Sequence, residues 1–592
     1  MTNPRASGTT PFRKESHKVD LCVVGGGLAG MCAAIAAARH GARVALMHER
    51  PVLGGNASSE IRMWVCGAGG ANNAETGIIE EILLDNLHRN PLQGFSIWDS
   101  ILYEKVRFEP NITLLLNCTC LDAAMAGDRV REVTGWQLTT QTWHTVEAGL
   151  FADCSGDSVL APLTGAECRM GREARREFGE SIEPEEADQR TMGMSCLIQA
   201  RETDRPQPFI PPPWAHPYRT DDDLPQRGHG IFDSNFWWIE LGGEQDSIHD
   251  TEAVRDELLK VAFGVWDHIK NHGDHGAENW ALDWVGFLPG KRESRRCLGD
   301  HLLTQNDVRA EARFDDLVAY GGWTMDDHHP AGLRWRGAPN IFHPAPSPYG
   351  IPYRCLYSRN VSNLFFAGRN ISITHAALSS TRVMATCAIL GQAVGTAAAL
   401  AAREGLLPRG LGEKRIAELQ QALMTDDCCI PWRRRTVPDL TKRARLTASA
   451  GDPEPLRNGV DRPVGEKDNG WAGDVGGSWL QYEFDAPAAV SRQRFVFDSD
   501  LNRNDHSDGH RRNLPCCYPL RPEPQKVPPS LTRAFRVEAR DPDGAWREIA
   551  RVQENHQRLV RLETSVRTTA IRFMPEATWG AARAHLFAWD VE

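Results

Sequence analysis

A glycine-rich turn between a short apolar strand and a small-residue helix constrains this chain more than any other feature. The turn is G-G-G-L-A-G at residues 25–30, which matches the spacing G-x-G-x-x-G. Residues 21–24 predict a buried strand, 31–40 an Ala-rich helix and 42–47 a second strand. The three glycines permit a tight turn, close approach of a pyrophosphate, and close packing of helix on strand. This segment therefore predicts a β-α-β unit that binds a dinucleotide.

The bulk composition indicates a globular protein of several domains. Its 592 residues exceed what one hydrophobic core serves, so we expect about two to four domains. The net charge of −11 disfavours a general binder of nucleic acid or acidic membranes. The 15 cysteines include no C-x-x-C pair, which fits neither a disulfide framework nor a zinc site. Residues 1–18 contain no apolar leader, so we predict a cytoplasmic protein. We expect no nucleic-acid or membrane partner, and a homo-oligomer remains possible.

One window, residues 383–402, is apolar enough to suggest a membrane span. It contains Thr386, Gln392 and Thr396, and much of its apolar content is alanine and glycine. We therefore predict a buried helix that packs closely on a sheet.

Changes in sequence texture divide the chain. A Pro-rich stretch, a Trp-rich strand candidate at 236–240 and a helix candidate at 251–271 indicate an inserted α+β substrate domain. After residue 440, alternating segments between turn residues predict an antiparallel β-sandwich. We predict an α/β fold with these parts: a flexible tail (1–18), the nucleotide domain (19–190 and 341–405), the substrate domain (191–340), a helical linker (406–440) and the β-sandwich (441–592).

Further segments indicate which dinucleotide the turn binds. Glu49, at the end of the second predicted strand, is placed to accept hydrogen bonds from a ribose diol. The loop at 53–60 can wrap a long cofactor, and the loop at 153–157 can close over its pyrophosphate. The stretch G-R-N-I-S-I-T-H at 368–375 adds a late glycine turn, and a helix beginning near 380–382 points free N–H groups at an electron-poor ring. This arrangement predicts FAD.

Residues 19–440 resemble the FAD-dependent oxidoreductases of the glutathione-reductase-2-type superfamily, which includes fumarate reductase and succinate dehydrogenase-like flavoproteins. The resemblance is carried by V-V-G-G-G-L-A-G, L-G-G-N-A-S-S-E-I-R, P-G-K-R-E-S-R-R, Y-G-I-P-Y-R and A-G-R-N-I-S-I-T-H-A-A-L-S-S-T-R. It implies a Rossmann-like FAD-binding domain and hydride exchange at the flavin. It also implies these flavin-binding or flavin-framing positions: Gly25, Gly27, Gly30, Glu49, Arg50, Gly55, Asn56, Ser58, Gly156, Asp157, Gly368, Arg369 and Arg382.

The C-terminal region resembles a different family. The segments N-G-V-D-R-P, N-G-W and G-S-W-L-Q-Y-E-F-D are similar to those of discoidin, or F5/8 type C, sandwiches. Such sandwiches bind glycans at loop tips or serve as packing modules, so the resemblance implies a fold and leaves the role open.

Three side chains are predicted to be catalytic. His375 follows the late glycine turn, where a neutral imidazole could take a hydroxyl proton, although a core histidine is the plain alternative. Arg62 could hold a substrate oxygen or stabilise the reduced flavin, or it could pair with Glu60 or Glu80. Arg295 lies in a charged run after a buried-looking segment and could bind a polar or anionic group, whereas most such runs face solvent.

The chain is predicted to pass from the substrate domain back to the nucleotide domain near residue 340. Loops at such a junction commonly line a substrate cleft. The alternative for each residue in these loops is hydrogen bonding between the domains. Trp237 and Trp238 offer an aromatic platform for a sugar, but neighbours on a strand point oppositely, so at most one serves. The predicted substrate-binding residues are Asp327, His329, Tyr349, Arg354 and Trp238.

The histidines at 268, 272 and 275 raise the question of a metal. His268 and His272 are four residues apart and could share a helix face. Gly273 is expected to end the helix before His275, and two ligands without a clear third do not make a site. We predict no metal and a solvated helix end.

Together these features predict an FAD-dependent enzyme that oxidises a carbinol in a sugar, glycoside or polyol and passes electrons to an unknown acceptor. The first alternative is reduction of an activated C=C bond, with Arg295 and Arg354 as acid and clamp. The second is a glycan-binding protein whose flavin is structural.

Overall fold

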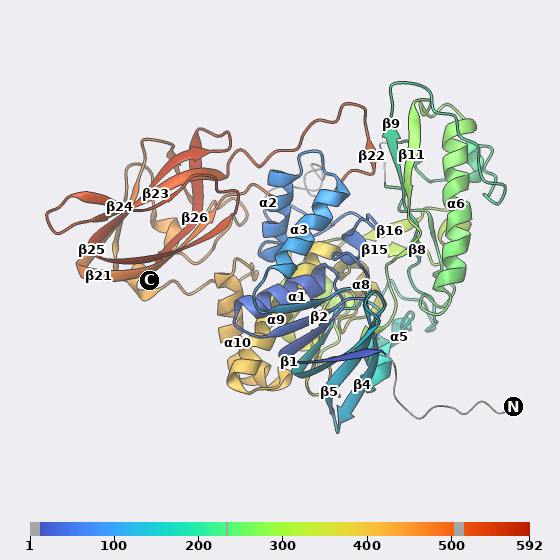
Figure 1. Ribbon diagram of the computed structural model, residues 1–592, viewed down its shortest axis with the longest axis horizontal. Helices are drawn as coiled ribbons and strands as arrows, with labels where there is room; N and C mark the ends of the chain where they lie inside the picture. The colour runs from blue at the N-terminus through green and yellow to red at the C-terminus, as the bar shows by residue number, and fades with distance from the viewer. Residues whose placement is uncertain (1–11, 232–234, 502–513) are drawn as a thin grey trace.

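The computed structural model describes residues 12–231, 235–501 and 514–592, which form three connected parts (Figure 1). The nucleotide domain lies in the middle of the molecule. The substrate domain, with the long helix α6, lies on one side of it, and the C-terminal β-domain lies on the other.

A mixed seven-stranded sheet forms the centre of the nucleotide domain. Strands β3, β2, β1 and β6 run parallel in that order, and β18 pairs parallel with β6. Strand β5 pairs antiparallel with β6, and β4 pairs antiparallel with β5 at the edge of the sheet. The strands are β1 (Arg13–Val24), β2 (Val44–Met47), β3 (Ile112–Leu115), β4 (Cys118–Ala126), β5 (Arg129–Gln137), β6 (Thr142–Asp153) and β18 (Leu364–Phe366).

The first strand begins earlier than the sequence predicts. Residues 13–18 pair with residues 142–147 of β6, so they belong to the sheet. The predicted flexible tail is wrong over these residues, and residues 1–11 lie outside the described part of the chain. All six side chains of this stretch are polar and exposed or half-buried, so no apolar alternation marks the strand in the sequence.

Two small-residue helices, α1 (Leu28–Arg39) and α9 (Met384–Glu404), lie side by side on the parallel strands. Helix α9 is long and apolar enough to cross a membrane, but 94% of its apolar window is buried inside the protein. The expectation of a buried, closely packed helix is confirmed. The other helices of the domain are α2 (Ile78–Arg89), α3 (Phe95–Arg107), α8 (His375–Thr381) and α10 (Pro408–Thr425).

Close packing of α9 on α1 depends on glycine, which gives a first prediction. A Cβ at Gly391 would lie 1.9 Å from the backbone oxygen of Ala29, so Gly391→Ala forces the helices apart. We expect a loss of about 1–3 kcal/mol in the free energy of unfolding, measured by urea unfolding. The matched control is Gly410→Ala in α10, where the nearest atom to a new Cβ is 4.0 Å away. That change should stabilise by about 0.5–1 kcal/mol, and equal effects of the two changes would contradict the packing argument.

The substrate domain combines short antiparallel strands with one long helix, and α6 (Thr251–Asn271) has the predicted bounds. The predicted strand at 236–240 is wrong, because Phe236 turns the backbone at φ 57° and only β10 (Glu240–Leu241) pairs. The remaining elements used below are β8 (Met194–Ser195), β9 (Ile198–Glu202), β11 (Trp280–Val285), β12 (Gly290–Lys291), β14 (Leu317–Gly321), β15 (Met325–His328), β16 (Asn340–His343) and β17 (Tyr349–Pro352).

The C-terminal domain is an antiparallel sheet of seven strands, ordered β20-β26-β21-β25-β23-β24, with β19 beside β21. Its predicted antiparallel character is confirmed. Aromatic rings fill the core, and Phe495 lies within 6 Å of the rings of Phe535, Phe573 and Trp589. The strands are β19 (Arg445–Ala448), β20 (Trp471–Asp474), β21 (Leu480–Phe497), β23 (Thr532–Arg540), β24 (Trp546–Val552), β25 (Leu559–Thr578) and β26 (Arg583–Val591).

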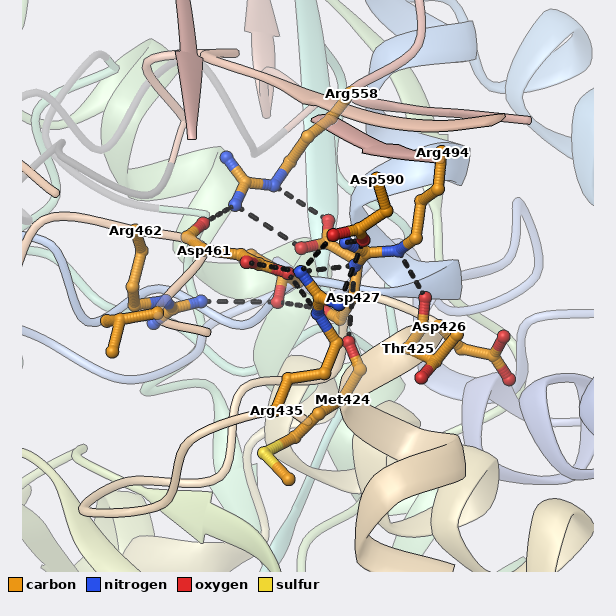
Figure 2. Close-up of polar contacts among 12 residues, drawn as sticks. Met424, Thr425, Asp426, Asp427, Arg435, Asp461, Arg462, Arg494, Arg558 and Asp590 are labelled. Atoms are coloured by element: carbon orange, nitrogen blue, oxygen red, sulfur yellow. Dashed lines mark hydrogen bonds and ion pairs between the residues drawn. The ribbon is translucent and has the colours of Figure 1, made fainter. Parts of the chain in front are cut away.

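A buried network of charges joins the C-terminal domain to the end of α10 (Figure 2). Arg435 lies 2.8 Å from Asp590 and 3.1 Å from Asp461. Arg494 binds Asp461 at 2.9 Å and donates to the backbone oxygen of Thr425 at 2.8 Å. Each of these two arginines and two aspartates has an opposite partner, which is the condition under which burial of ions is tolerated.

The C-terminal region also reaches the substrate domain. Strand β22 (Cys517–Tyr518) pairs parallel with β9, so β9 lies between β11 and β22. Trp64 donates to the backbone oxygen of Leu514 at 3.1 Å, and Gln199 donates to that of Pro515 at 3.0 Å. The predicted boundary at residue 441 therefore does not separate two independent units.

Candidate functional site

A cavity of about 630 Å³ lies where the nucleotide and substrate domains meet. Its size is in the range of ligand pockets. The ends of β1, β2 and β6 supply one part of the wall, and β12, β15 and the start of α9 supply another. Because the carboxyl ends of parallel strands share one edge, the loops after them converge there.

The glycine turn forms one wall of the cavity. Gly25 has φ 106°, and a Cβ there would lie 2.4 Å from the backbone of Cys154. Gly27 and Gly55 face each other, since a Cβ on Gly55 would lie 3.1 Å from the Cα of Gly27. Gly30 lies behind the wall, where a Cβ would meet the backbone oxygen of Gly25 at 1.8 Å. The turn thus presents bare backbone to the cavity, as a pyrophosphate requires.

His48 fixes the shape of this turn. Its Nδ1 accepts the backbone N–H of Gly26 at 3.0 Å, so the neutral ring carries hydrogen on Nε2, which donates to the backbone oxygen of Val52 at 3.0 Å. Glu49 and Arg50 follow at the end of β2 and line the cavity as predicted. Sequence reasoning missed His48, because a histidine beside the acid predicted to bind the ribose carries no distinctive pattern.

Asp157 organises the opposite wall. It accepts from Lys291 at 2.8 Å, from Arg369 at 2.7 Å and from Ser294 at 2.7 Å. Burial alone would raise the pKa of Asp157, but the charges of Arg369 and Lys291 and their hydrogen bonds hold it well below the usual value. The ionised carboxylate thereby aligns two cations along the cavity. Lys291 was not predicted.

A second polar group lines the substrate-domain end of the cavity. His328 lies between two carboxylates, with Nδ1 at 2.6 Å from Glu240 Oε2 and Nε2 at 3.2 Å from Asp326 Oδ2. Arg382 donates to Asp326 at 3.1 Å, and Asn340 donates to its other oxygen. Burial opposes ionisation of Asp326, but His328 and Arg382 lower its pKa well below the usual value.

Arg292 and Trp237 complete this end. Arg292 is 6% exposed and donates to the hydroxyl of Ser195 at 2.9 Å and to the backbone oxygen of Trp237 at 2.9 Å. It lies 3.4 Å from Glu240. The ring of Trp237 meets that of His328 edge to face at 5.1 Å. Both residues line the cavity, and neither was the one chosen from the sequence.

The residues present fit FAD. Bare backbone at the glycine turn suits a pyrophosphate, and buried cations beside it suit its charge. Arg50 Nη1, Arg369 Nε and Arg382 Nε are buried and have no hydrogen-bond partner within residues 12–231, 235–501 and 514–592. All three residues line the cavity, so a ligand with acceptor groups would satisfy these donors. Helix α9 begins at Met384, slightly later than predicted, and this residue also lines the cavity.

Most predicted cofactor positions lie on the cavity wall. Those that line it are Gly25, Gly27, Glu49, Arg50, Gly55, Asn56, Gly156, Asp157, Gly368, Arg369 and Arg382. Gly30 and Ser58 act from behind it. The Ser58 hydroxyl donates to the backbone oxygen of Gly55 at 2.7 Å and shapes the loop.

His375 does not take the predicted place at the cavity. It is 1% exposed and lies behind the wall, with Nδ1 at 2.8 Å from Glu293 and Nε2 at 3.3 Å from Asp327. Burial would lower the pKa of His375, but Glu293, Asp327 and Glu183 raise it well above its usual value. Both ring nitrogens of His375 are thus occupied by carboxylates behind the wall, and the imidazole does not face a substrate in the cavity.

The carboxylates around His375 cap α8 and give a pH prediction. Glu183 accepts the backbone N–H of Ala376 at 2.7 Å, and burial raises the pKa of Glu183 to about 7. This pKa lies above the ordinary 4.5, so the folded protein holds the Glu183 proton more tightly than the unfolded chain does. The stability that this proton adds to the folded state is fully present below pH 4.5 and is lost as pH rises through about 7. Glu183→Gln should remove that loss, so the variant should gain about 2–3 kcal/mol over wild type above pH 7 and little at pH 4.5. Urea unfolding across this range measures it.

The control for this prediction is Glu185→Gln. Glu185 is exposed and pairs with Arg175, so its replacement should change the free energy of unfolding by less than about 1 kcal/mol at every pH. A Glu183→Gln variant that tracks wild type across the same pH range would contradict the raised pKa.

The other predicted catalytic residues also lie off the cavity. Arg62 packs its guanidinium over the rings of Trp284 at 4.3 Å and Phe95 at 4.9 Å, and it donates to Gln199. Arg295 is half-buried, and its neighbour three residues earlier, Arg292, is the one on the wall. Both predictions are corrected: the charged run does reach the site, but through a different residue.

The predicted substrate residues are corrected in the same way. Asp327 points to His375, and His329 stacks on Trp335 at 4.4 Å. The hydroxyl of Tyr349 bonds Ser380 at 2.6 Å, and Arg354 pairs with Asp316 at 3.0 Å near the surface. Trp238 is buried and donates to the backbone oxygen of Gly228 at 2.7 Å. Interdomain bonding, the stated alternative, holds for Asp327 and Arg354, whereas His329 and Tyr349 contact residues of their own domains and Trp238 is a core residue.

Comparisons with known proteins address the two regions separately. A comparison with curated proteins finds no match. Among solved structures, the family 32 carbohydrate-binding module of Streptococcus pneumoniae EndoD is 13% identical, covers 26% of this chain and 97% of its own, and has a TM-score of 0.19. Chitosan-binding module 1 from Paenibacillus sp. IK-5 is 10% identical, covers 26% and 98%, and has a TM-score of 0.19. Likenesses this low assign no ligand and no function to this chain.

The family comparison covers the region that builds the cavity. The model of the family described as FAD dependent oxidoreductase matches residues 20–423, which is more than half of the chain. The match includes the glycine turn, the loops at Asp157 and Arg369 and the substrate-domain wall. The chain belongs to the FAD dependent oxidoreductase family and is an FAD-dependent oxidoreductase.

Proposed function

We propose that the enzyme oxidises a carbinol in a sugar, glycoside or related polyol. The observation that carries this proposal is the set of groups at the substrate-domain end of the cavity. A carboxylate (Asp326), an amide (Asn340), two guanidiniums (Arg292 and Arg382) and an indole (Trp237) line one wall there. Hydroxyl-rich ligands are bound by such mixtures of acceptors, donors and an aromatic face.

His328 is the proposed proton acceptor. Glu240, 2% exposed, accepts the Nδ1–H of His328 at 2.6 Å, which orients the ring and leaves Nε2 as the exchangeable position. Asp326 Oδ2 lies 3.2 Å from Nε2. In the neutral ring a substrate hydroxyl replaces Asp326 as the partner of Nε2, because a carboxylate oxygen and an unprotonated nitrogen both only accept. The substrate O–H proton passes to Nε2, and the resulting imidazolium is held between two carboxylates. FAD, when bound, supplies the acceptor for the hydride of the carbinol.

Arg292 and Arg382 favour a second candidate, reduction of an activated C=C bond. Burial lowers the pKa of Arg292, which makes its guanidinium a better proton donor. A carboxylate substrate would pair with Arg382, whose Nε is buried and has no partner within the described residues. This candidate replaces Arg295 and Arg354 of the sequence prediction with two arginines that line the cavity.

Anaerobic titration of the purified flavoprotein separates the two candidates. A panel of sugars, glycosides and polyols is added, and the absorbance of the oxidised flavin is followed. Bleaching by a member of the panel supports carbinol oxidation. If no member bleaches the flavin but an enoate restores the colour of dithionite-reduced protein, carbinol oxidation is wrong and C=C reduction takes its place.

A further inference from the structure

Three imidazoles and a carboxylate converge in the substrate domain, on residues that the catalytic cavity does not use. Asp221 begins the short helix η2 (Asp221–Asp223), His229 follows on the same loop, His268 lies on the last turn of α6, and His275 lies in the loop after it. The ring centroids form a near-regular triangle, with separations of 4.9 Å (His229–His268), 4.8 Å (His229–His275) and 4.9 Å (His268–His275).

The Asp221 oxygen lies from each imidazole nitrogen at a separation close to that in a tetrahedral metal site, and all four ligand atoms lie within 4.8 Å of one another. Asp221 Oδ1 lies 3.5 Å from Nε2 of His229, 3.2 Å from Nε2 of His268 and 3.8 Å from Nε2 of His275. Bonds of about 2.0–2.1 Å to a tetrahedral ion place ligand atoms about 3.3 Å apart. The four atoms therefore surround a point that one small cation can occupy with little movement.

Hydrogen bonds on the far side of two rings set the tautomer that a metal needs. Nδ1 of His229 donates to the backbone oxygen of Arg227 at 2.9 Å, and Nδ1 of His268 donates to that of Tyr218 at 3.2 Å. Carbonyl oxygens only accept, so these Nδ1 atoms carry the hydrogen and each neutral ring directs its Nε2 lone pair inward. Such outer carbonyl contacts accompany histidine ligands of metals.

Two of the inward nitrogens make no hydrogen bond. Nε2 of His268 and Nε2 of His275 are buried and make no hydrogen bond within the described parts of the chain. His268 is fully buried. Converging lone pairs repel each other, so a cation at the centre is what satisfies them. The exposed Asp221 side chain leaves a route for the ion to enter.

We propose that Asp221, His229, His268 and His275 bind a divalent transition-metal ion of the zinc class. Four protein ligands fill a tetrahedral shell, which is the arrangement of a structural site rather than a catalytic one. The ion ties the loop at 221–229 to the end of α6 and to the turn at Gly273, whose φ of 136° brings His275 back toward the helix. This assignment revises the expectation that the chain holds no metal and that the helix end is solvated.

The test measures zinc in the full-length holoenzyme, purified without a histidine tag. Wild-type protein is equilibrated with Zn²⁺, freed of excess ion, and analysed by elemental mass spectrometry and by competition with a chromophoric chelator. The variants are Asp221→Asn, His229→Gln and His275→Gln, which avoid the fully buried His268. The matched control is His272→Gln, because His272 lies four residues after His268 but bonds Asp267 at 3.2 Å instead.

We expect one tightly bound zinc ion in wild type and in His272→Gln. Each ligand variant should lose more zinc affinity than the about 10–100-fold that is lost when an outer hydrogen bond to a ligand is removed. X-ray absorption at the zinc edge should show three imidazole nitrogens and one oxygen at about 2.0–2.1 Å. Circular dichroism and flavin content of each variant show whether it is folded. No tight zinc in wild type, or loss from His272→Gln equal to that from the ligand variants, would overturn the proposal.

Discussion

Asp157→Ala should release FAD and lower the free energy of unfolding by about 3–4 kcal/mol. The change leaves Lys291 and Arg369 without the carboxylate that pairs them, and uncompensated buried charge is costly. This loss of stability is smaller than the largest losses seen when a buried ion pair is broken, because 28% of the Asp157 side chain is exposed and water screens its charge. Flavin absorbance per chain after gel filtration and urea unfolding measure the two effects.

Asp20→Ala is the matched control for this change. Asp20 pairs with Arg43 at 2.8 Å, but Arg43 keeps 61% of its side chain exposed, so water replaces the lost partner. We expect full flavin content and a stability change below about 1 kcal/mol. Wild-type flavin content and stability in Asp157→Ala would show that the carboxylate does not align the two cations.

His328→Gln should slow bleaching of the flavin about 10²–10⁴-fold while FAD stays bound. Glutamine can keep a hydrogen bond to Glu240 but cannot take a proton from a carbinol, so binding survives and proton transfer is lost. The measurement is the anaerobic stopped-flow rate with the sugar or polyol that bleaches the wild-type enzyme.

His375→Gln separates this assignment from the one that the sequence suggested. His375 lies behind the cavity wall between Glu293 and Asp327, so its loss should lower stability and leave the saturated bleaching rate within about tenfold of wild type. A larger rate loss in His375→Gln than in His328→Gln, with both variants folded and yellow, would reverse the roles given to the two histidines.

The sequence located the site by segment but missed several of its residues. It singled out Asp327, His329 and Trp238, whereas Asp326, His328 and Trp237 line the cavity. Asp326 and His328 share one face of β15 because side chains alternate along a strand, and Asp327 points the other way to His375. A choice between the two faces depends on register, which is set by partners distant in the chain.

Elements with strong local signals were predicted well. The glycine turn, α6 and α9 follow from periodicity and from small residues whose spacing admits few folds. The cluster of Asp221, His229, His268 and His275 was missed because its ligands come from a loop, a helix end and a turn with no repeated spacing. Contacts of this kind exist only after the tertiary fold has formed.

Strand β22 links the C-terminal region to the substrate domain. It belongs by chain order to the C-terminal region, yet it covers the edge of β9, a strand of the substrate domain. Removal of everything after residue 440 would uncover a row of unpaired backbone groups on β9, which invites association between copies. The oxidoreductase region therefore depends on the C-terminal region to complete one sheet of its substrate domain.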